Sequence, residues 1–191
     1  MSEQGGGGRY DRTTNGLIGS MIVIVVVVLG VVIVRGFVSK DLDQGRPKAV
    51  EYLESVEGLQ ANGFDVVYPP TLPDGWIVSN VDFTPGERAT YGLNFYTADD
   101  KFVGLRQEDA SVDDLLEEFV DATTVSEDPL IGVGSVAPEW EGWSDEGGDR
   151  AFTTESGENT VVVFGDVSAA ELTELVALLT TVPVPTSSST P

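Results

Sequence analysis

An uncharged, apolar run of 18 residues, Leu17–Val34, constrains this chain more than any other feature of its sequence. An α-helix rises about 1.5 Å per residue, so the run spans roughly 27 Å, close to the hydrocarbon thickness of a bilayer. Arg12 and Arg35 bracket the run, and Tyr10 and Phe37 lie where interfacial aromatic side chains gather. The pattern predicts a transmembrane helix over residues 17–34.

A cleaved signal peptide is the alternative interpretation of this run. The run is longer than the apolar region of a signal peptide, and no small-x-small cleavage site follows it. Arg35, Gly36 and Phe37 follow instead. Because the chain has no Cys, it cannot be a lipoprotein either. We therefore predict an uncleaved, single-pass anchor.

Basic residues flank the predicted anchor on both sides. Two precede it and four follow it: Arg9, Arg12, Arg35, Lys40, Arg46 and Lys48. The charges alone would keep the longer side in the cytoplasm, but long domains are translocated largely regardless of charge. We expect a cytoplasmic tail over residues 1–16, a linker over 35–48 and an exported domain over 49–182. This orientation rests mainly on the family resemblance described below.

The composition excludes several classes of chemistry. The chain has no Cys and no His, which excludes disulfides, thiolate nucleophiles, imidazole bases and metal sites built from those residues. It has 32 acidic and 10 basic residues, and 28 of the acids but only four of the bases fall within residues 49–182. Such a surface repels phosphate groups, so we expect no nucleic-acid partner. We also expect no cofactor and no metal ion.

Both ends of the chain are too polar to bury a core. Residues 5–8 are four consecutive glycines, and residues 183–191 read PVPTSSSTP. We therefore expect both tails to be disordered. Pro47 suits a first helical position and predicts a helix over residues 48–60. Asn62 and Gly63 would end this helix.

Short β-branched or aromatic runs separated by turn residues predict an antiparallel sheet. The strands are expected at residues 76–83, 91–96, 101–107, 131–136, 140–143, 150–154 and 160–164, after an extended stretch at 64–67. Ser111 and Ser168 each begin a helix with a capping-box pattern. The predicted fold class is α+β, one antiparallel sheet with its helices on one side, preceded by a single transmembrane helix.

The order of strands followed by a helix occurs twice. Asp109 aligns with Asp166, Ser111 with Ser168 and Leu115 with Leu172. A duplicated unit would place Leu115 and Leu172 at matching positions between helix and sheet. The alternative is coincidence between two ordinary capped helices.

Several motifs together resemble a known family. They are Tyr68-Pro with Leu72-Pro-Asp-Gly-Trp76, the strands Tyr91–Thr97 and Lys101–Gln107, a Trp near residue 140, Thr160–Gly165 and the helix Ser168–Leu179, after an Arg9-Tyr…Arg12 tail and one anchor. This pattern resembles the actinobacterial membrane proteins of the domain-of-unknown-function family 4245 and covers nearly the whole chain. The resemblance implies a single-pass envelope protein with an exported domain, and it implies no activity.

Four residues are candidate binding residues: Trp76, Arg106, Trp140 and Trp143. Trp140 and Trp143 would lie on opposite faces of an extended segment, one in the core and one exposed, or together in a turn. Arg106 ends a strand together with Gln107. Its guanidinium could bind a carboxylate or phosphate ligand in a groove, or form a surface ion pair with nearby acids.

Paired acids such as Asp99-Asp100 and Asp113-Asp114 have two interpretations. Two carboxyl groups across a cleft would suit a glycosidase, with tryptophans as stacking surfaces, but a solvated acidic surface is the simpler one. Residues 145–149 likewise form either a loose calcium site or a plain turn, and we expect the turn.

The leading hypothesis is a non-catalytic exported domain that binds an envelope protein or glycan. The alternatives are a metal-independent carboxylate enzyme, similar to a glycosidase, and a carrier of a small apolar ligand. Two buried acids with raised pKa values in one cleft would support the enzyme. An apolar cavity of roughly 300 Å³ or more under the sheet would support the carrier.

Overall fold

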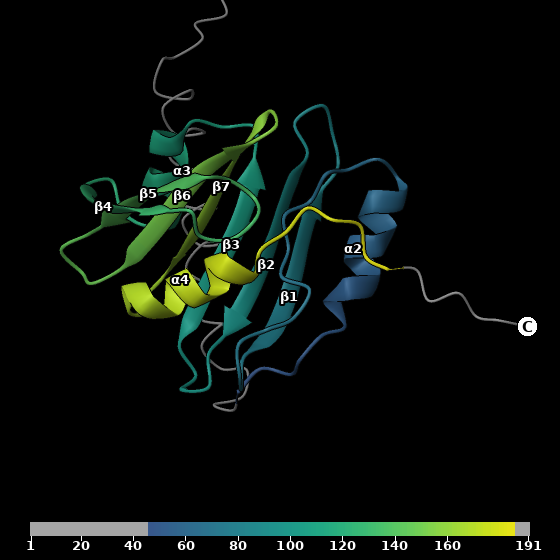
Figure 1. The fold of residues 1–191 in the computed structure, drawn as a ribbon, viewed down its shortest axis with the longest axis horizontal. Coiled ribbons are helices and arrows are strands. Elements are labelled where there is room, and N and C mark those ends of the chain that lie inside the picture. The colour runs from purple at the N-terminus through teal and green to yellow at the C-terminus, as the bar shows by residue number, and fades with distance from the viewer. Residues whose placement is uncertain (1–45, 186–191) are drawn as a thin grey trace, which may run out of the picture. The chain divides into compact units, whose positions relative to one another are not determined.

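The computed structural model describes residues 46–185, which form one antiparallel sheet of seven strands with three helices (Figure 1). The α+β class is therefore confirmed. The predicted tail over 1–16, the anchor over 17–34 and most of the linker over 35–48 lie outside the described residues. Within residues 46–185, no helix has the length and apolar character needed to cross a membrane.

The strands follow one another as hairpins from each edge toward the centre. The elements in chain order are α2 (Tyr52–Ala61), β1 (Ile77–Thr84), β2 (Thr90–Tyr96), β3 (Phe102–Glu108), α3 (Val112–Phe119), β4 (Val125–Ile131), β5 (Glu139–Ser144), β6 (Arg150–Ser156), β7 (Asn159–Gly165) and α4 (Ala169–Leu178). Their order in the sheet is β1-β2-β3-β7-β6-β5-β4, and every neighbouring pair is antiparallel. The two halves of the chain therefore meet at β3 and β7.

Helix α2 begins at Tyr52, later than the predicted start after Pro47. The backbone N–H of Val50 donates to the carbonyl oxygen of Val78 in β1 at 2.9 Å. That bond draws the segment before the helix along the edge of the sheet, so its residues cannot join the helix. The predicted end is confirmed, because Asn62 is the C-cap and Gly63 adopts a φ of 85°.

Six of the seven strands lie within one or two residues of the predicted ranges, but the prediction for residues 131–136 is wrong. The strand there is β4, which ends at Ile131. Gly132 and Gly134 adopt φ values of 68° and 74°, so this stretch turns instead of extending. Pro129 is tolerated in β4 because β4 is an edge strand with an irregular register between Glu127 and Leu130.

The sheet buries apolar side chains on both faces. On one face, α2, α4 and residues 66–68 cover a large cluster that includes Leu93, Leu105, Trp140, Val163 and Leu172, called the major core here. On the other face, α3 covers a smaller cluster of Leu115, Leu116, Ala151, Val162 and Phe164, called the minor core. Figure 1 shows α4 crossing the front of the sheet, with α2 beside β1. The prediction that all helices lie on one side is therefore wrong.

Strand alternation explains why α3 and α4 lie on opposite faces. Leu105 in β3 and Val162 in β7 hold the same position relative to their helix caps, yet Leu105 faces the major core and Val162 the minor core. After each strand the backbone turns to the face opposite that residue. Helix α3 therefore covers the minor core and helix α4 covers the major core.

The predicted duplication does not extend to three dimensions. The mirrored strand order and antiparallel β3–β7 pairing correspond to a two-fold axis normal to the sheet, which would keep both helices on one face. Leu115 and Leu172 instead lie in the minor and the major core, so the expectation that they fill matching places is wrong.

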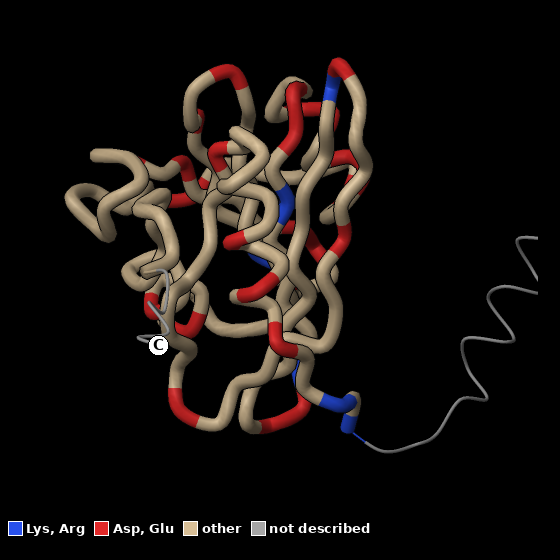
Figure 2. The backbone as a smooth tube through the Cα atoms, turned by 90° about the vertical axis from the view of Figure 1, so that its right-hand side faces the viewer, with Lys and Arg blue, Asp and Glu red and all other residues tan. Residues whose placement is uncertain are grey.

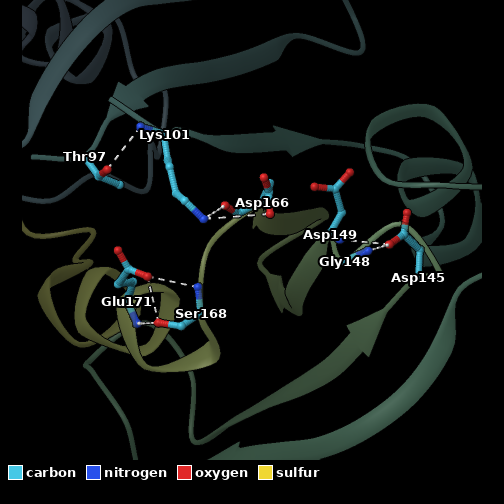
Figure 3. Close-up of polar contacts among 8 residues, drawn as sticks. All are labelled: Thr97, Lys101, Asp145, Gly148, Asp149, Asp166, Ser168 and Glu171. Atoms are coloured by element: carbon cyan, nitrogen blue, oxygen red, sulfur yellow. Dashed lines mark hydrogen bonds and ion pairs between the residues drawn. The ribbon is translucent and has the colours of Figure 1, made fainter. Parts of the chain in front are cut away.

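Both predicted helix caps are present, but only one forms a full capping box. The Ser168 hydroxyl accepts from the Glu171 N–H at 3.3 Å, and the Glu171 carboxylate accepts from the Ser168 N–H at 3.0 Å (Figure 3). Ser111 accepts from the Asp114 N–H at 3.2 Å, whereas the shorter Asp114 carboxylate accepts from the Ser111 hydroxyl at 2.7 Å.

The folded domain extends slightly past the predicted range of 49–182 at each end. Arg46 donates to the carbonyl oxygens of Gly75 and, at 3.0 Å, Thr97, and pairs with Asp100 at 3.3 Å. The Val184 N–H donates to Gln60 of α2 at 2.9 Å, and the Val184 side chain packs against the major core. For residues 183–185, the expectation of disorder is therefore wrong.

Candidate functional site

A pocket of about 520 Å³ lies at one end of the sheet. The β1–β2 hairpin, the end of β3 and the β6–β7 hairpin meet the segment after α2 there. The lining residues are 63–66, Phe83, 86–91, Gln107, Asp109 and 156–159. The pocket thus combines four segments that are distant in sequence.

Two buried polar residues of neighbouring strands line the pocket. Gln107 is 4% exposed, and its amide accepts from the Val67 N–H at 2.8 Å and donates to the Asp65 carbonyl oxygen at 2.6 Å. These bonds hold the segment over residues 65–67, of which Asp65 and Val66 line the pocket. Tyr91, paired with Gln107 across the strands, is 4% exposed, and its hydroxyl has no hydrogen-bond partner among the described residues. Burial raises the pKa of Tyr91, so its hydroxyl is neutral.

Carboxylates outnumber basic groups around the pocket. Its lining holds four acids, Asp65, Glu87, Asp109 and Glu158, and one base, Arg88. Arg88 pairs with Asp109 at 2.8 Å, and this contact lowers the pKa of Asp109. Within residues 46–185, none of the other three acids forms an ion pair. The pocket therefore carries a negative potential that favours a cationic or neutral ligand.

Trp76 and Trp140, two of the predicted binding residues, belong to the major core and not to the pocket. Trp76 is 9% exposed, directly before β1, and its ring lies 6.4 Å from that of Phe95. Trp140 is fully buried, and its indole N–H has no partner among the described residues. Neither ring can stack on a ligand without unpacking the core.

Arg106 and Gln107, which the sequence placed together at a groove, point to opposite faces of β3. Gln107 lines the pocket, whereas the Arg106 guanidinium lies over the Phe119 ring of α3 at 5.2 Å. Arg106 donates to the Leu105 carbonyl oxygen and to the Asn94 side chain, both at 2.8 Å, and lies 3.7 Å from Asp82. Burial lowers the pKa of Arg106 and the charge of Asp82 opposes this shift. Of the two alternatives for Arg106, the structure has the ion pair, but the arginine side chain is largely buried and is held by groups of β1, β2 and β3.

Trp143 lies on the face opposite Trp140, as the extended-segment interpretation predicts. It is half-buried against the minor core, and its indole N–H donates to the Thr153 hydroxyl at 2.8 Å. The structure therefore does not bring Trp76, Arg106, Trp140 and Trp143 into one site.

Among residues 46–185, two carboxyl groups have raised pKa values, and they lie far apart. Burial, with the charge of Glu118, raises the pKa of Glu108, and burial, with Asp145 and Asp166, raises that of Asp149. Glu108 pairs with the start of β7, whereas Asp149 precedes Arg150, which pairs with the end of β7. Neither lines the pocket. This arrangement does not provide the acid pair across one cleft that a glycosidase requires.

Residues 145–149 form the expected turn. The Asp145 carboxylate accepts from the backbone N–H groups of Gly148 at 2.7 Å and Asp149 at 2.8 Å (Figure 3). The Asp145 carboxylate therefore stabilises the turn through these two hydrogen bonds. Across residues 46–185, no group of three or more acidic side chains is arranged to hold a metal ion.

The pocket residues were missed because no local pattern marks them. Arg88 follows a Pro-Gly turn and Asp109 precedes a helix cap, and both features are common in surface loops. Gln107 was the only one signalled, through its place at a strand end.

Comparison with known proteins agrees with the motifs. A search of curated proteins returns no match. Residues 9–179 match the sequence profile of a family described as proteins of unknown function, DUF4245. That match covers residues 9–45 before the described part of the chain, the whole sheet and all three described helices. The chain therefore belongs to the DUF4245 family.

Proposed function

We propose that this is a single-pass membrane protein whose exported acidic domain binds a partner in the cell envelope without catalysing a reaction. Its anchor is the uncharged run over residues 17–34. The site of binding is the pocket at the end of the sheet. The single observation that carries the proposal is this pocket, with three lining carboxylates that form no ion pair within residues 46–185.

The charge of the domain supports a cationic group as the part of the partner that enters the pocket. Acidic residues are spread over the whole domain, whereas basic residues are few (Figure 2). Asp65, Glu87 and Glu158 can accept hydrogen bonds from an ammonium or guanidinium group, while the buried Gln107 and Tyr91 restrict its depth. A lysine or arginine side chain of an envelope protein has this chemistry.

Binding of a lysine analogue tests the pocket. The full-length protein in detergent is titrated by NMR or calorimetry with Nα-acetyl-lysinamide and with the uncharged isostere Nα-acetyl-norleucinamide. We expect saturable binding of the lysine compound only. Glu87→Gln and Glu158→Gln should each weaken it about threefold, the range of an exposed charge pair, whereas Glu174→Gln on α4 should not. Equal binding of both compounds, or none, would contradict the proposal.

Protease accessibility tests the topology. Protease added to intact spheroplasts should digest residues 49–182, because the proposed exported domain faces outward. Detection of the residue 1–16 tail with an antibody should require permeabilised cells. Complete protection of the domain, together with digestion after permeabilisation, would reverse the orientation.

A further inference from the structure

The face of the sheet that carries the minor core is covered unevenly. Helix α3 packs on β7. Over β1, β2 and β3, side chains on this face remain accessible among the described residues: Asn80 and Asp82 are exposed, Phe102 is 37% exposed, and Asn94 and Tyr96 are half-buried. We call these five residues the open face. It lies opposite the major core and is separate from the pocket.

Two aromatic rings of the open face, those of Tyr96 and Phe102, lie near the β2–β3 turn. Tyr96 and Phe102 face each other across the two strands, with ring centroids 6.1 Å apart and an interplanar angle of 77°. One ring therefore presents its face where the other presents its edge. Phe102 also lies 6.0 Å from Phe164 of the minor core, which supports it from below. Accessible aromatic rings held rigidly in this way offer an apolar contact at low entropic cost.

A row of polar side chains, fixed by hydrogen bonds, lies beside these two rings. Asn80 donates to Asp82 at 2.7 Å, and Arg106 donates to Asn94 at 2.8 Å and lies 3.7 Å from Asp82. Gly92 makes this row possible, because a Cβ at Gly92 would lie 2.6 Å from the Arg106 guanidinium that crosses above it. The remaining donors and acceptors of Asn80, Asp82 and Asn94 are directed by these bonds. They stand about 7 Å or more along the strands from the rings.

This combination matches consecutive sugars of a polysaccharide chain. The C–H face of a pyranose packs on an aromatic ring, and its vicinal hydroxyls form paired hydrogen bonds with amide and carboxylate side chains. Carboxylate acceptors that are already oriented make such bonds stronger than neutral ones.

Charge argues against the other occupants of an open face. Asp82 is exposed, and the Arg106 charge is engaged by Asp82, Asn94 and two aromatic rings. At the β2–β3 turn beside the rings, Lys101 and Arg46, which pairs with Asp100, balance the charges of Asp99 and Asp100. The exposed Asp82 and the excess of acids over the whole domain disfavour anionic lipid and nucleic acid. The accessible aromatic side chains of this face are the half-buried Tyr96 and the 37% exposed Phe102, whereas a standard protein interface buries roughly 800 Å² on each partner.

We propose that the open face binds a neutral polysaccharide, with one sugar ring on Tyr96 and Phe102 and the hydroxyls of the neighbouring sugars on Asn94, Asn80 and Asp82. Arg106 is a positioning residue, because it holds Asp82 and Asn94. The site is independent of the pocket and adds a second partner class. A flat surface of this kind suits a chain of sugars better than a free monosaccharide.

Affinity electrophoresis tests the proposal. The full-length protein is run in native gels containing mannan, β-1,3-glucan or galactan, with polygalacturonate as an anionic comparison. A polyoxyethylene detergent is needed, because maltoside headgroups would compete for the site. We expect retardation by at least one neutral polymer and not by polygalacturonate. Phe102→Ala should weaken binding about tenfold, and the exposed Asp82→Ala should weaken it as well. Val125→Ala, another exposed apolar residue at the far edge of the sheet, should leave it unchanged.

Each result supports or contradicts the proposal that the open face binds a polysaccharide. Thermal unfolding of each variant shows whether it is folded, and Asp82→Ala is informative if Phe102→Ala is not. No retardation in any neutral polymer, or retardation unchanged in Asp82→Ala, would overturn the proposal. Binding to phosphatidylcholine vesicles that Asp82→Ala and Phe102→Ala abolish, without polysaccharide binding, would identify a membrane contact and also overturn it. Because Glu87→Gln should not alter retardation, failure here leaves the pocket untouched.

Discussion

Replacing Trp140 with alanine is expected to lower the free energy of unfolding by about 3–5 kcal/mol, the cost of deleting a large buried aromatic side chain. Trp140 is fully buried in the major core, between the sheet and the elements that cover it. Domains of this size are stable by about 5–15 kcal/mol, so the loss is a large share of the total. Urea denaturation followed by circular dichroism measures the change.

Trp143→Ala is the matched control. Trp143 lies on the same strand, half-buried on the opposite face, and makes one side-chain hydrogen bond, to Thr153. Its removal leaves less of a cavity, so the expected loss is about 1–3 kcal/mol. A Trp140→Ala variant as stable as Trp143→Ala would show that Trp140 does not fill the major core as described.

Leu115→Ala and Leu172→Ala are each expected to cost about 2–5 kcal/mol. Leu115 is 1% exposed under α3 and Leu172 is fully buried under α4, so each truncation leaves a cavity between a helix and the sheet. The two residues lie in separate clusters on opposite faces. Their effects in the double variant should therefore add within about 0.5 kcal/mol, as measured by urea midpoints and slopes.

Two outcomes would contradict this description. A silent Leu115→Ala would mean that α3 does not pack on β7, and a silent Leu172→Ala would mean the same for α4. Coupling well above the additive limit would indicate that the two leucines share one cluster, as a sheet with both helices on one face would require.

The elements that local interactions specify were predictable from the sequence. Ser111 and Ser168 mark the helix starts because their hydroxyls accept backbone N–H bonds only a few residues away. The strands next to tight turns were predictable for the same reason, since Ser156-Gly157 and Gly147-Gly148 place their hairpins directly. Strand β4 was missed because its residues are almost all exposed and its register is irregular, so it has no alternating pattern.

The candidate sites were much less predictable. The tryptophans were candidate stacking surfaces for a ligand. Trp76 and Trp140 lie in the major core instead, as large apolar side chains most often do. Arg106 was singled out as a ligand group, and only the close approach over Gly92 reveals that it positions its neighbours. The pocket depends on Gln107 holding Asp65 and Val67, contacts across 42 and 40 residues of sequence that no local pattern encodes.

The sequence by itself determined the chemistry that is excluded, the acidic character of the domain, the antiparallel strands and the caps of α3 and α4, because composition and near-neighbour hydrogen bonds need no tertiary context. Only the tertiary structure decided that α3 and α4 cover opposite faces, that four separate segments enclose one pocket, and that β1, β2 and β3 keep an open face. The physical reason is strand alternation: a shift of one residue in where a strand begins sends every later side chain, and the helix that follows, to the other side of the sheet.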